Sequence, residues 1–210
     1  MTCALIVIAK APVPGRVKTR LCPPCTPEQA AALAEASLAD TLAAVAAAPA
    51  VRRVCVLDGE PGPWLPDGFE VVAQRGGGLD ERLAAAFEDV AEPALLVGMD
   101  TPHVTPGLLA AGQRMLTSSD AVLGGAPDGG YWAIGLRRAD RALFAGVPMS
   151  TSETCTAQRA RLHEAALRVA ELPQLRDVDT IEDARAVAAC APASRFAARL
   201  AALDMEEAAA

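Results

Sequence analysis

Four cationic side chains lie close together near the start of the chain: Lys10, Arg16, Lys18 and Arg20. The two lysines are the only ones in a sequence that otherwise carries its positive charge on arginine. Lysine offers a compact, mobile ammonium, whereas arginine offers a rigid fork that matches phosphate oxygens. Gly15, between them, would let the backbone approach a ligand closely. This pattern predicts a loop that binds nucleotide phosphates, and a solvated basic loop is the alternative.

A glycine-rich segment occupies residues 74–82, after a short apolar run. Its consecutive glycines, which include Gly76 and Gly77, would let a flat base or a ribose approach the backbone. The helix predicted directly after them would favour an anion at its N-terminus. We therefore expect Gln74, Gly76, Gly77 and Arg82 to contact the nucleotide, although a flexible turn would have the same composition.

Two aspartates are candidate ligands for a divalent cation. Asp100 comes directly after an apolar run, where its carboxylate could hold Mg²⁺ or Mn²⁺ beside a triphosphate. Asp179 comes late in the chain and could supply a second carboxylate to the same ion. Each has another interpretation: Asp100 could form a turn before Pro102, and Asp179 could cap the following helix together with Glu182. The sequence leaves both alternatives open.

Asp128 and Tyr131 belong to a segment, residues 126–136, that begins with turn residues and ends in an apolar run. Asp-Gly-Gly is common in hairpin turns, which would explain the segment without any ligand. Tyr131, however, is the only tyrosine in the chain, and a tryptophan follows it. An aromatic surface beside a carboxylate also suits an acceptor pocket, and we expect Asp128 and Tyr131 among the ligand-binding residues.

The candidate segments fall at the ends of strand-like runs. Apolar runs of strand length alternate with helical patterns, which is typical of an α/β sandwich with a mainly parallel sheet. In such sheets, ligands bind beyond the carboxyl ends of the strands. The alternation breaks over residues 124–136, which indicates a strand paired out of sequential order. The expected strands are 3–9, 51–57, 69–73, 94–98, 121–124, one within 124–136 and 168–172; the expected helices are 27–48, 79–90, 105–116, 151–167, 181–190 and the tail from 192.

Composition limits the classes of partner. A net charge of −7 argues against a large nucleic-acid surface and suits a small anionic ligand bound with a divalent cation. The apolar runs have strand length, which argues against a membrane span, and the first nine residues lack the features of a signal peptide. We therefore expect a cytoplasmic protein with no membrane or nucleic-acid partner, folded as one domain over residues 1–210. Cys22 and Cys25 have the spacing of a redox or zinc-binding pair, but a rigid turn before the next helix is the simpler interpretation.

Four ordered motifs carry a family resemblance. They are the segments 9–21, 98–100, 128–136 and 172–180. In this order they resemble a bacterial family of GT-A-like transferases, known as a domain of unknown function or as radical-SAM/selenodomain-associated transferase 1. More distantly, they are similar to nucleotidyltransferases of the nucleotide-diphospho-sugar transferase superfamily, such as 2-phospholactate guanylyltransferase, the molybdenum-cofactor nucleotidyltransferases and the CMP-sugar synthetases.

The resemblance implies a GT-A, Rossmann-like three-layer sandwich with a mainly parallel mixed sheet. It also implies that the cations of residues 10–20 bind the triphosphate, with Arg16 and Lys18 acting in catalysis together with Asp100. Asp100 and Asp179 would bind Mg²⁺ or Mn²⁺.

We therefore expect a metal-dependent nucleotidyltransferase that moves a nucleoside monophosphate from a nucleoside triphosphate to a small phosphate- or phosphonate-bearing acceptor. The alternatives are a glycosyltransferase with a nucleotide-sugar donor, which the lone carboxylate after the central strand disfavours, and a catalytically silent nucleotide-binding protein. Trp132 and Met149 replace the Tyr and Trp common in the family, and both lie on the expected acceptor side. The base, the acceptor and the oligomeric state stay open, with a dimer among the alternatives.

Overall fold

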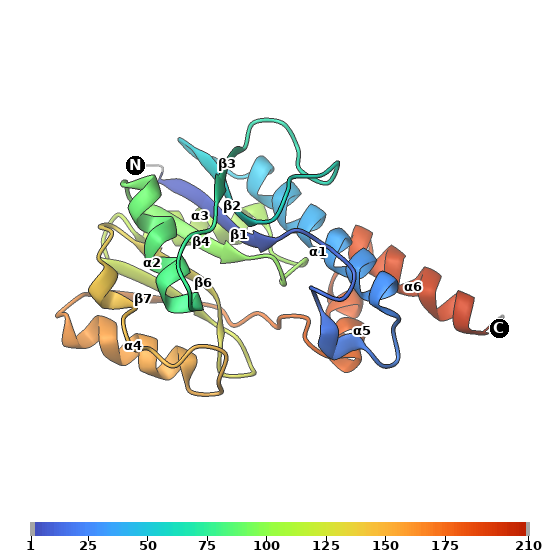
Figure 1. Ribbon diagram of the computed structural model, residues 1–210. Helices are drawn as coiled ribbons and strands as arrows, with labels where there is room; N and C mark the ends of the chain where they lie inside the picture. Colours follow the sequence, from blue (N-terminus) through green and yellow to red (C-terminus); the bar gives the residue numbers. More distant parts are fainter. Residues whose placement is uncertain (1–2, 209–210) are drawn as a thin grey trace.

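The fold is taken from a computed structural model, which covers the backbone of residues 3–208 and the side chains through residue 204. These residues form a seven-stranded sheet with helices on both faces (Figure 1). The strands are Ala4–Lys10 (β1), Arg53–Asp58 (β2), Glu70–Ala73 (β3), Ala94–Gly98 (β4), Ala121–Gly125 (β5), Tyr131–Leu136 (β6) and Val169–Leu172 (β7). The helices are Pro27–Ala47 (α1), Leu79–Val90 (α2), Pro106–Met115 (α3), Thr154–Glu164 (α4), Ile181–Cys190 (α5) and Arg195–Ala208 (α6), with the short 3-10 helices Thr19–Leu21 (η1) and Arg141–Leu143 (η2).

The strands are ordered β3-β2-β1-β4-β6-β5-β7 across the sheet. β6 runs antiparallel to both of its neighbours, and the other adjacent pairs are parallel. A tight turn over residues 126–130 causes this, because it reverses the chain after β5 and inserts β6 between β5 and β4. The predicted break in alternation is therefore confirmed, and so is the mainly parallel mixed sheet.

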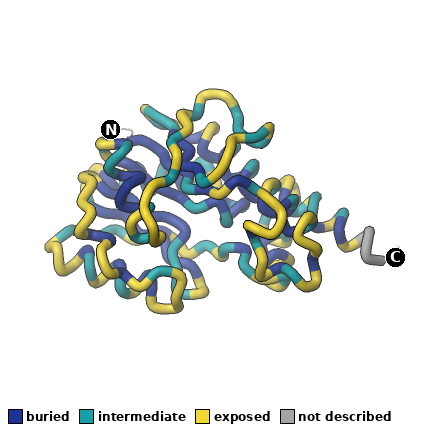
Figure 2. The backbone as a smooth tube through the Cα atoms, in the orientation of Figure 1, coloured by how far each residue is buried: buried dark blue, intermediate teal, exposed yellow. Residues whose placement is uncertain are grey.

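Two core clusters lie on opposite faces of the sheet, and the strands between them are buried (Figure 2). Successive side chains of a strand point to opposite faces, so Leu5 and Val7 of β1 join the cluster with α1 and α3. Ala4 and Ile6 join the cluster with α2 and α4. This arrangement is the predicted three-layer α/β sandwich.

α1 begins with a capping box, in which Thr26 and Gln29 exchange hydrogen bonds, and with Pro27 at its first position. It has 21 residues and, within the described chain, is the one helix long and apolar enough to cross a membrane. The expectation that all apolar runs have strand length is therefore wrong here, because the many alanines make this helix apolar. In the structure α1 is a core helix: Leu38 and Leu42 pack toward the sheet, and α6 packs along it.

Parallel pairing brings several strand ends to one edge of the sheet. Lys10 at the end of β1 lies opposite Asp58 of β2, and Ile8 lies opposite Gly98 at the end of β4. The segments after β1, β2, β3 and β4 therefore leave the sheet at the same edge, where ligands of α/β proteins bind. Three of the predicted candidate segments start here.

A third core cluster joins α1 to α5 and α6, which extend beyond the sheet (Figure 1). Leu21 and Val178 belong to this cluster and are 0% and 1% exposed. Leu21 ends the cation-bearing loop, and Val178 lies between Asp177 and Asp179. Burial of these two apolar side chains therefore holds the basic loop and the late aspartates beside each other.

Candidate functional site

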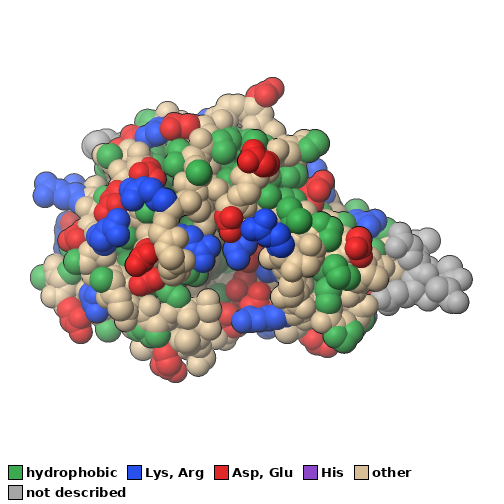
Figure 3. Space-filling model, in the orientation of Figure 1, with side chains coloured by type: hydrophobic (Ala, Val, Ile, Leu, Met, Phe, Trp, Pro, Cys, Tyr) green, Lys and Arg blue, Asp and Glu red, His purple; other side chains and the backbone are tan. Residues whose placement is uncertain are grey.

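A cleft of about 700 Å³ opens at the carboxyl edge of the sheet. Basic and acidic side chains gather around this hollow in the middle of Figure 3. A neighbouring cleft of about 270 Å³ lies against the loop of residues 10–20. Lys10, Arg20, Asp100 and Asp179 line both spaces, so the predicted phosphate loop and the predicted metal ligands share one wall.

Lys18 is the most deeply buried of the four predicted phosphate-binding cations. Its Nζ lies 2.8 Å from Asp100 Oδ1 and 3.4 Å from Asp179 Oδ1, and it donates a hydrogen bond to Val178 O. Burial acts to lower the pKa of this ammonium, but the carboxylates of Asp100, Asp179 and Asp177 outweigh burial and raise it. Lys18 is therefore a fixed positive charge between the two predicted metal ligands.

The other three cations of this loop are exposed. The Arg20 guanidinium lies 2.7 Å from Asp179 Oδ2, and its side chain is 68% exposed. The Arg16 guanidinium lies 3.9 Å from Asp58 Oδ1, and its side chain is 66% exposed. Lys10 ends β1 and is exposed at the junction of the two clefts. Exposed ion pairs are weak, so these side chains can turn toward a bound polyphosphate at little cost.

Gly15, Gly76 and Gly77 do not line either cleft. Gly15 has φ +75° with open space around it, so it serves the turn of the basic loop. Gly76 has φ +112° and packs on Glu81, whose carboxylate accepts a hydrogen bond from Gly77 N at 2.7 Å. The glycine-rich turn is thus folded onto the start of α2, and the expected close contact between these glycines and a nucleotide stays a prediction.

Gln74 and Arg82 both line the large cleft. Gln74 Nε2 donates hydrogen bonds to Ala9 O at 2.7 Å and to Val56 O at 3.2 Å. Gln74 Oε1 accepts a hydrogen bond from the Arg82 guanidinium at 3.4 Å. The Gln74 amide therefore joins the ends of β1 and β2 and orients Arg82 at the edge of the cleft.

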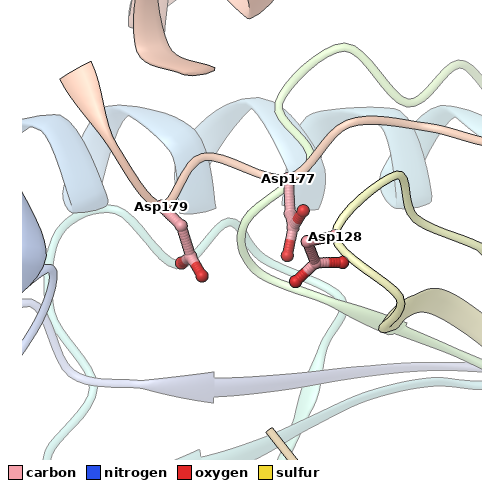
Figure 4. Close-up of side chains that lie close together, drawn as sticks. All are labelled: Asp128, Asp177 and Asp179. Atoms are coloured by element: carbon pink, nitrogen blue, oxygen red, sulfur yellow. The ribbon is translucent and has the colours of Figure 1, made fainter. Parts of the chain in front are cut away.

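Three carboxylates lie close together in the wall of the large cleft (Figure 4). Asp128, Asp177 and Asp179 each offer an oxygen, and these oxygens lie within 4.8 Å of one another. Burial, with the nearby charges of Asp128 and Asp179, raises the pKa of Asp177 to about 6. Sequence reasoning missed Asp177 as a site residue. The Asp-Val-Asp alternation was the available signal, because Val178 is buried and its two neighbours point the other way.

Two buried oxygens lie after β4, Asp100 Oδ1 and Thr101 Oγ1, and within the described part of the chain Thr101 Oγ1 has no hydrogen-bond partner. Asp100 Oδ1 meets Lys18 as an ion pair, and Thr101 is 1% exposed in the wall of the large cleft. Buried oxygens are normally paired, and carboxylate oxygens are the ligands that Mg²⁺ and Mn²⁺ prefer. The donor set therefore fits a hard divalent cation. Thr101 has no signal of its own in the sequence.

The cap of α5 rules out one of the two interpretations of Asp179. Thr180 is the N-cap, and it exchanges hydrogen bonds with Asp183 in a capping box. The alternative of an Asp179 cap with Glu182 is therefore wrong, because the helix begins one residue later than that pairing requires. The Asp179 carboxylate is left for Lys18 and Arg20.

Asp128 and Tyr131 are held by the turn between β5 and β6. Asp128 Oδ1 accepts a hydrogen bond from Gly130 N at 2.8 Å, so the predicted hairpin chemistry is present. The Tyr131 hydroxyl lies 3.4 Å from Gln158 Oε1 and 3.9 Å from Met149 Sδ, and burial raises its pKa. Both residues also line the large cleft, so the turn and the ligand interpretations are compatible.

The family model of DUF2064, described as uncharacterized proteins conserved in bacteria, matches residues 30–151, more than half of the sequence. The chain belongs to the DUF2064 family. The DUF2064 match contains Asp100 and Asp128, whereas Lys18 and Asp179 lie outside it. No curated protein matches the chain.

The fold of this DUF2064 protein is similar to those of solved transferase structures. A protein of Desulfovibrio desulfuricans G20, provisionally assigned as a nucleotide-diphospho-sugar transferase, is 28% identical with a TM-score of 0.85, covering 99% of this chain and 96% of that one. A cytidylyltransferase from Leptospira borgpetersenii is 14% identical with a TM-score of 0.60, covering 99% and 96%. The 2-C-methyl-D-erythritol 4-phosphate cytidylyltransferase of Thermus thermophilus is 18% identical with a TM-score of 0.53, covering 90% and 98%. The predicted GT-A-like fold of the nucleotide-diphospho-sugar transferase superfamily is confirmed.

Proposed function

We propose that this DUF2064 protein is a metal-dependent nucleotidyltransferase. It transfers a nucleoside monophosphate from a nucleoside triphosphate to a small phosphate- or phosphonate-bearing acceptor and releases pyrophosphate. The observation that carries the proposal is the meeting of Lys18 with Asp100 and Asp179 where the basic loop joins the large cleft. Because the clefts collect residues from Ile8 to Asp183, we also propose that residues 1–210 act as one GT-A-like domain.

The smaller cleft suits the β- and γ-phosphates of the donor. Its walls carry four cations, namely Lys10, Arg16, Lys18 and Arg20, and two carboxylates. The excess of positive charge favours a polyphosphate, and the arginine forks can bind its oxygens bidentately. The α-phosphate would then lie toward Asp100, at the entrance to the large cleft.

Asp100 and Asp179 would hold Mg²⁺ or Mn²⁺, with Asp128 and Asp177 within reach of the same region. The Asp100 carboxylate, which lines both clefts, and the close oxygens of the other three aspartates support this assignment. A divalent cation bound there would supply positive charge that neutralises the phosphate oxygens at the reacting centre. Lys18, already paired with both predicted ligands, would add its own charge to the same side of the donor.

The transfer breaks one phosphorus–oxygen bond and forms another. An anionic oxygen of the acceptor attacks the α-phosphorus with its electron pair, and the bond to the bridging oxygen breaks so that pyrophosphate leaves. The acceptor needs no proton removed, and neither His103 nor His163 lines either cleft. Arg16, Lys18 and Arg20 would stabilise the negative charge that develops on the leaving pyrophosphate.

A second candidate is transfer of a sugar from a nucleotide sugar. The provisional name of the 28% identical Desulfovibrio desulfuricans protein favours it. The same carboxylates would serve a nucleoside-diphosphate leaving group, which carries less negative charge than a triphosphate donor. The four-cation wall of the smaller cleft therefore favours the first proposal.

One assay separates these reactions. The protein is incubated with Mg²⁺, each nucleoside triphosphate and a panel of small phosphates and phosphonates, and pyrophosphate release is measured. We expect release that depends on the acceptor and on Asp100. Pyrophosphate release would exclude a silent binding protein, whereas release of nucleoside diphosphate from nucleotide sugars, without any pyrophosphate from triphosphates, would reject the nucleotidyl transfer proposed here.

A further inference from the structure

We propose that Trp132 is a positioning residue for the late aspartates. It would hold residues 173–180, the carboxylate strap, so that Asp177 and Asp179 face the large cleft. The consequence for metal binding rests on the proposed function, whereas the contacts that hold the strap do not.

The carboxylate strap connects β7 to α5 without helix or strand structure. Its second half is well anchored, because Val178 N donates a hydrogen bond to Asp100 O at 3.0 Å and the Val178 side chain is buried. In its first half, residues 173–176, Leu175 N donates to Gly125 O at a longer 3.3 Å. The Trp132 indole donates from Nε1 to Pro173 O at 3.0 Å, a side-chain hydrogen bond to the main chain of that half.

The packing around the indole ring allows this contact. Trp132 is 3% exposed and lies over Gly124 of β5, the strand between β6 and β7. A Cβ atom at Gly124 would lie 2.6 Å from Trp132 Nε1 and 2.7 Å from Cε2, too close for either atom to stay in place. Gly124 is opposite Leu172 at the end of β7. The missing side chain at Gly124 therefore lets the indole cross β5 and reach the start of the strap.

Loss of the indole N–H would leave Pro173 O without this donor and loosen the first half of the strap. Asp177 lies directly between that half and the Val178 anchor, so its carboxylate would sample more positions. Residues that orient metal ligands through hydrogen bonds typically change metal affinity by about 10- to 100-fold when they are removed. We expect the lower end of that range, because Trp132 acts through the main chain.

The test compares Trp132→Phe with Trp64→Phe, a matched control. Trp64 is the other tryptophan of the chain, packs against the same core cluster and does not line either cleft. Two readouts are used: hydrogen exchange of peptides covering residues 173–180, and Mn²⁺ affinity from electron paramagnetic resonance. Trp132→Phe should speed exchange in the strap alone and weaken Mn²⁺ binding by about tenfold, whereas Trp64→Phe should change neither.

Gly124→Ala should also speed exchange in the strap and weaken Mn²⁺ binding, because it displaces the indole without removing it. This variant is used in place of Trp132→Phe if Trp132→Phe does not fold. Strap exchange and Mn²⁺ affinity equal to those of Trp64→Phe would overturn the inference while leaving nucleotidyl transfer by the native protein unaffected. The expected changes in a protein that releases no pyrophosphate would sink the proposed function and keep the positioning role. Failure of the native protein to bind Mn²⁺ would sink the proposed metal site, and strap exchange alone would then decide the positioning role.

Discussion

Lys18 Nζ lies 2.8 Å from Asp100 Oδ1 and joins the loop after β1 to the end of β4. The same ammonium lies 3.4 Å from Asp179 Oδ1, so two carboxylates from distant parts of the sequence share one buried lysine. Its side chain is 8% exposed, whereas those of Asp100 and Asp179 are 38% and 31% exposed. The carboxylates therefore face the cleft, and the lysine neutralises them from the protein side.

Removal of Lys18 should make folding depend on divalent cations. In Lys18→Met, the two carboxylates lose their buried counter-charge and repel each other, which we expect to lower the free energy of unfolding by about 1–3 kcal/mol. Added Mg²⁺ should restore part of that loss by binding the carboxylates. Urea unfolding with and without Mg²⁺ measures both effects. Arg20→Met, which removes a 68% exposed partner of Asp179, is the control and should change stability little.

Asp100→Asn should separate metal-linked binding from folding. The amide keeps the shape of the side chain but removes the charge that a divalent cation requires. We expect pyrophosphate release to fall by at least about a hundredfold and Mg²⁺-dependent thermal stabilisation by nucleotide to disappear. Asp89→Asn is the matched control, because Asp89 pairs with Arg75 at 2.8 Å and does not line either cleft. Equal loss of activity in both variants would contradict the metal assignment.

The raised pKa of Asp177 predicts a pH dependence of stability. The pKa is about 6 in the folded protein against an ordinary 3.8, so between these values the folded state keeps a proton that the unfolded chain releases. The contribution of Asp177 to the free energy of unfolding therefore falls as pH rises from about 4 to 6. Without divalent metal, Asp177→Asn should match the native protein below pH 4 and exceed its stability above pH 6, by about 1–3 kcal/mol.

Asp120 supplies the opposite case for the same urea titrations. Hydrogen bonds from the Arg168 side chain and backbone lower its pKa to about 2, so its stabilising contribution is present above pH 4 and is lost as pH falls toward 2. Asp120→Asn should therefore be less stable than the native protein at neutral pH.

The Asp177 prediction has its own contradicting outcome. If the free energy of unfolding of Asp177→Asn runs parallel to that of the native protein at all pH values, the environment assigned to Asp177 is wrong.

Gly129→Ala should damage the turn that carries Asp128. Gly129 has φ +92°, and a Cβ atom there would lie 1.9 Å from Ser152 O, a main-chain atom that cannot move away alone. We expect a loss of at least about 3 kcal/mol, the sum of backbone strain and overpacking. Gly146→Ala is the control, because Gly146 has φ +73° with nothing within 4 Å and should cost only the strain, about 1 kcal/mol. Similar losses in both variants, measured by urea unfolding, would show that the close contact has no effect.

Local pattern was sufficient for most of the fold. α2 and α5 span the predicted residues 79–90 and 181–190, and α1 begins at the predicted residue 27, where Thr26 and Pro27 start the helix. α4 begins at Thr154 rather than at the predicted residue 151, because the preceding residues form a turn in which the Thr154 hydroxyl donates to Pro148 O at 2.7 Å, and it ends at Glu164 rather than at 167. Such side-chain hydrogen bonds compete with the first helical turn and leave no clear trace in periodicity.

The sequence by itself determined the residue types of the site and the strand ends that carry them, because side-chain chemistry and hydrophobic period are local properties. It therefore predicted Lys18, Asp100 and Asp179 as partners in one site. Only the tertiary structure decided that Lys18 is buried between those carboxylates and that Asp177 joins Asp128. Both facts depend on the packing of Leu21 and Val178 into one core cluster, a contact between residues far apart in the chain.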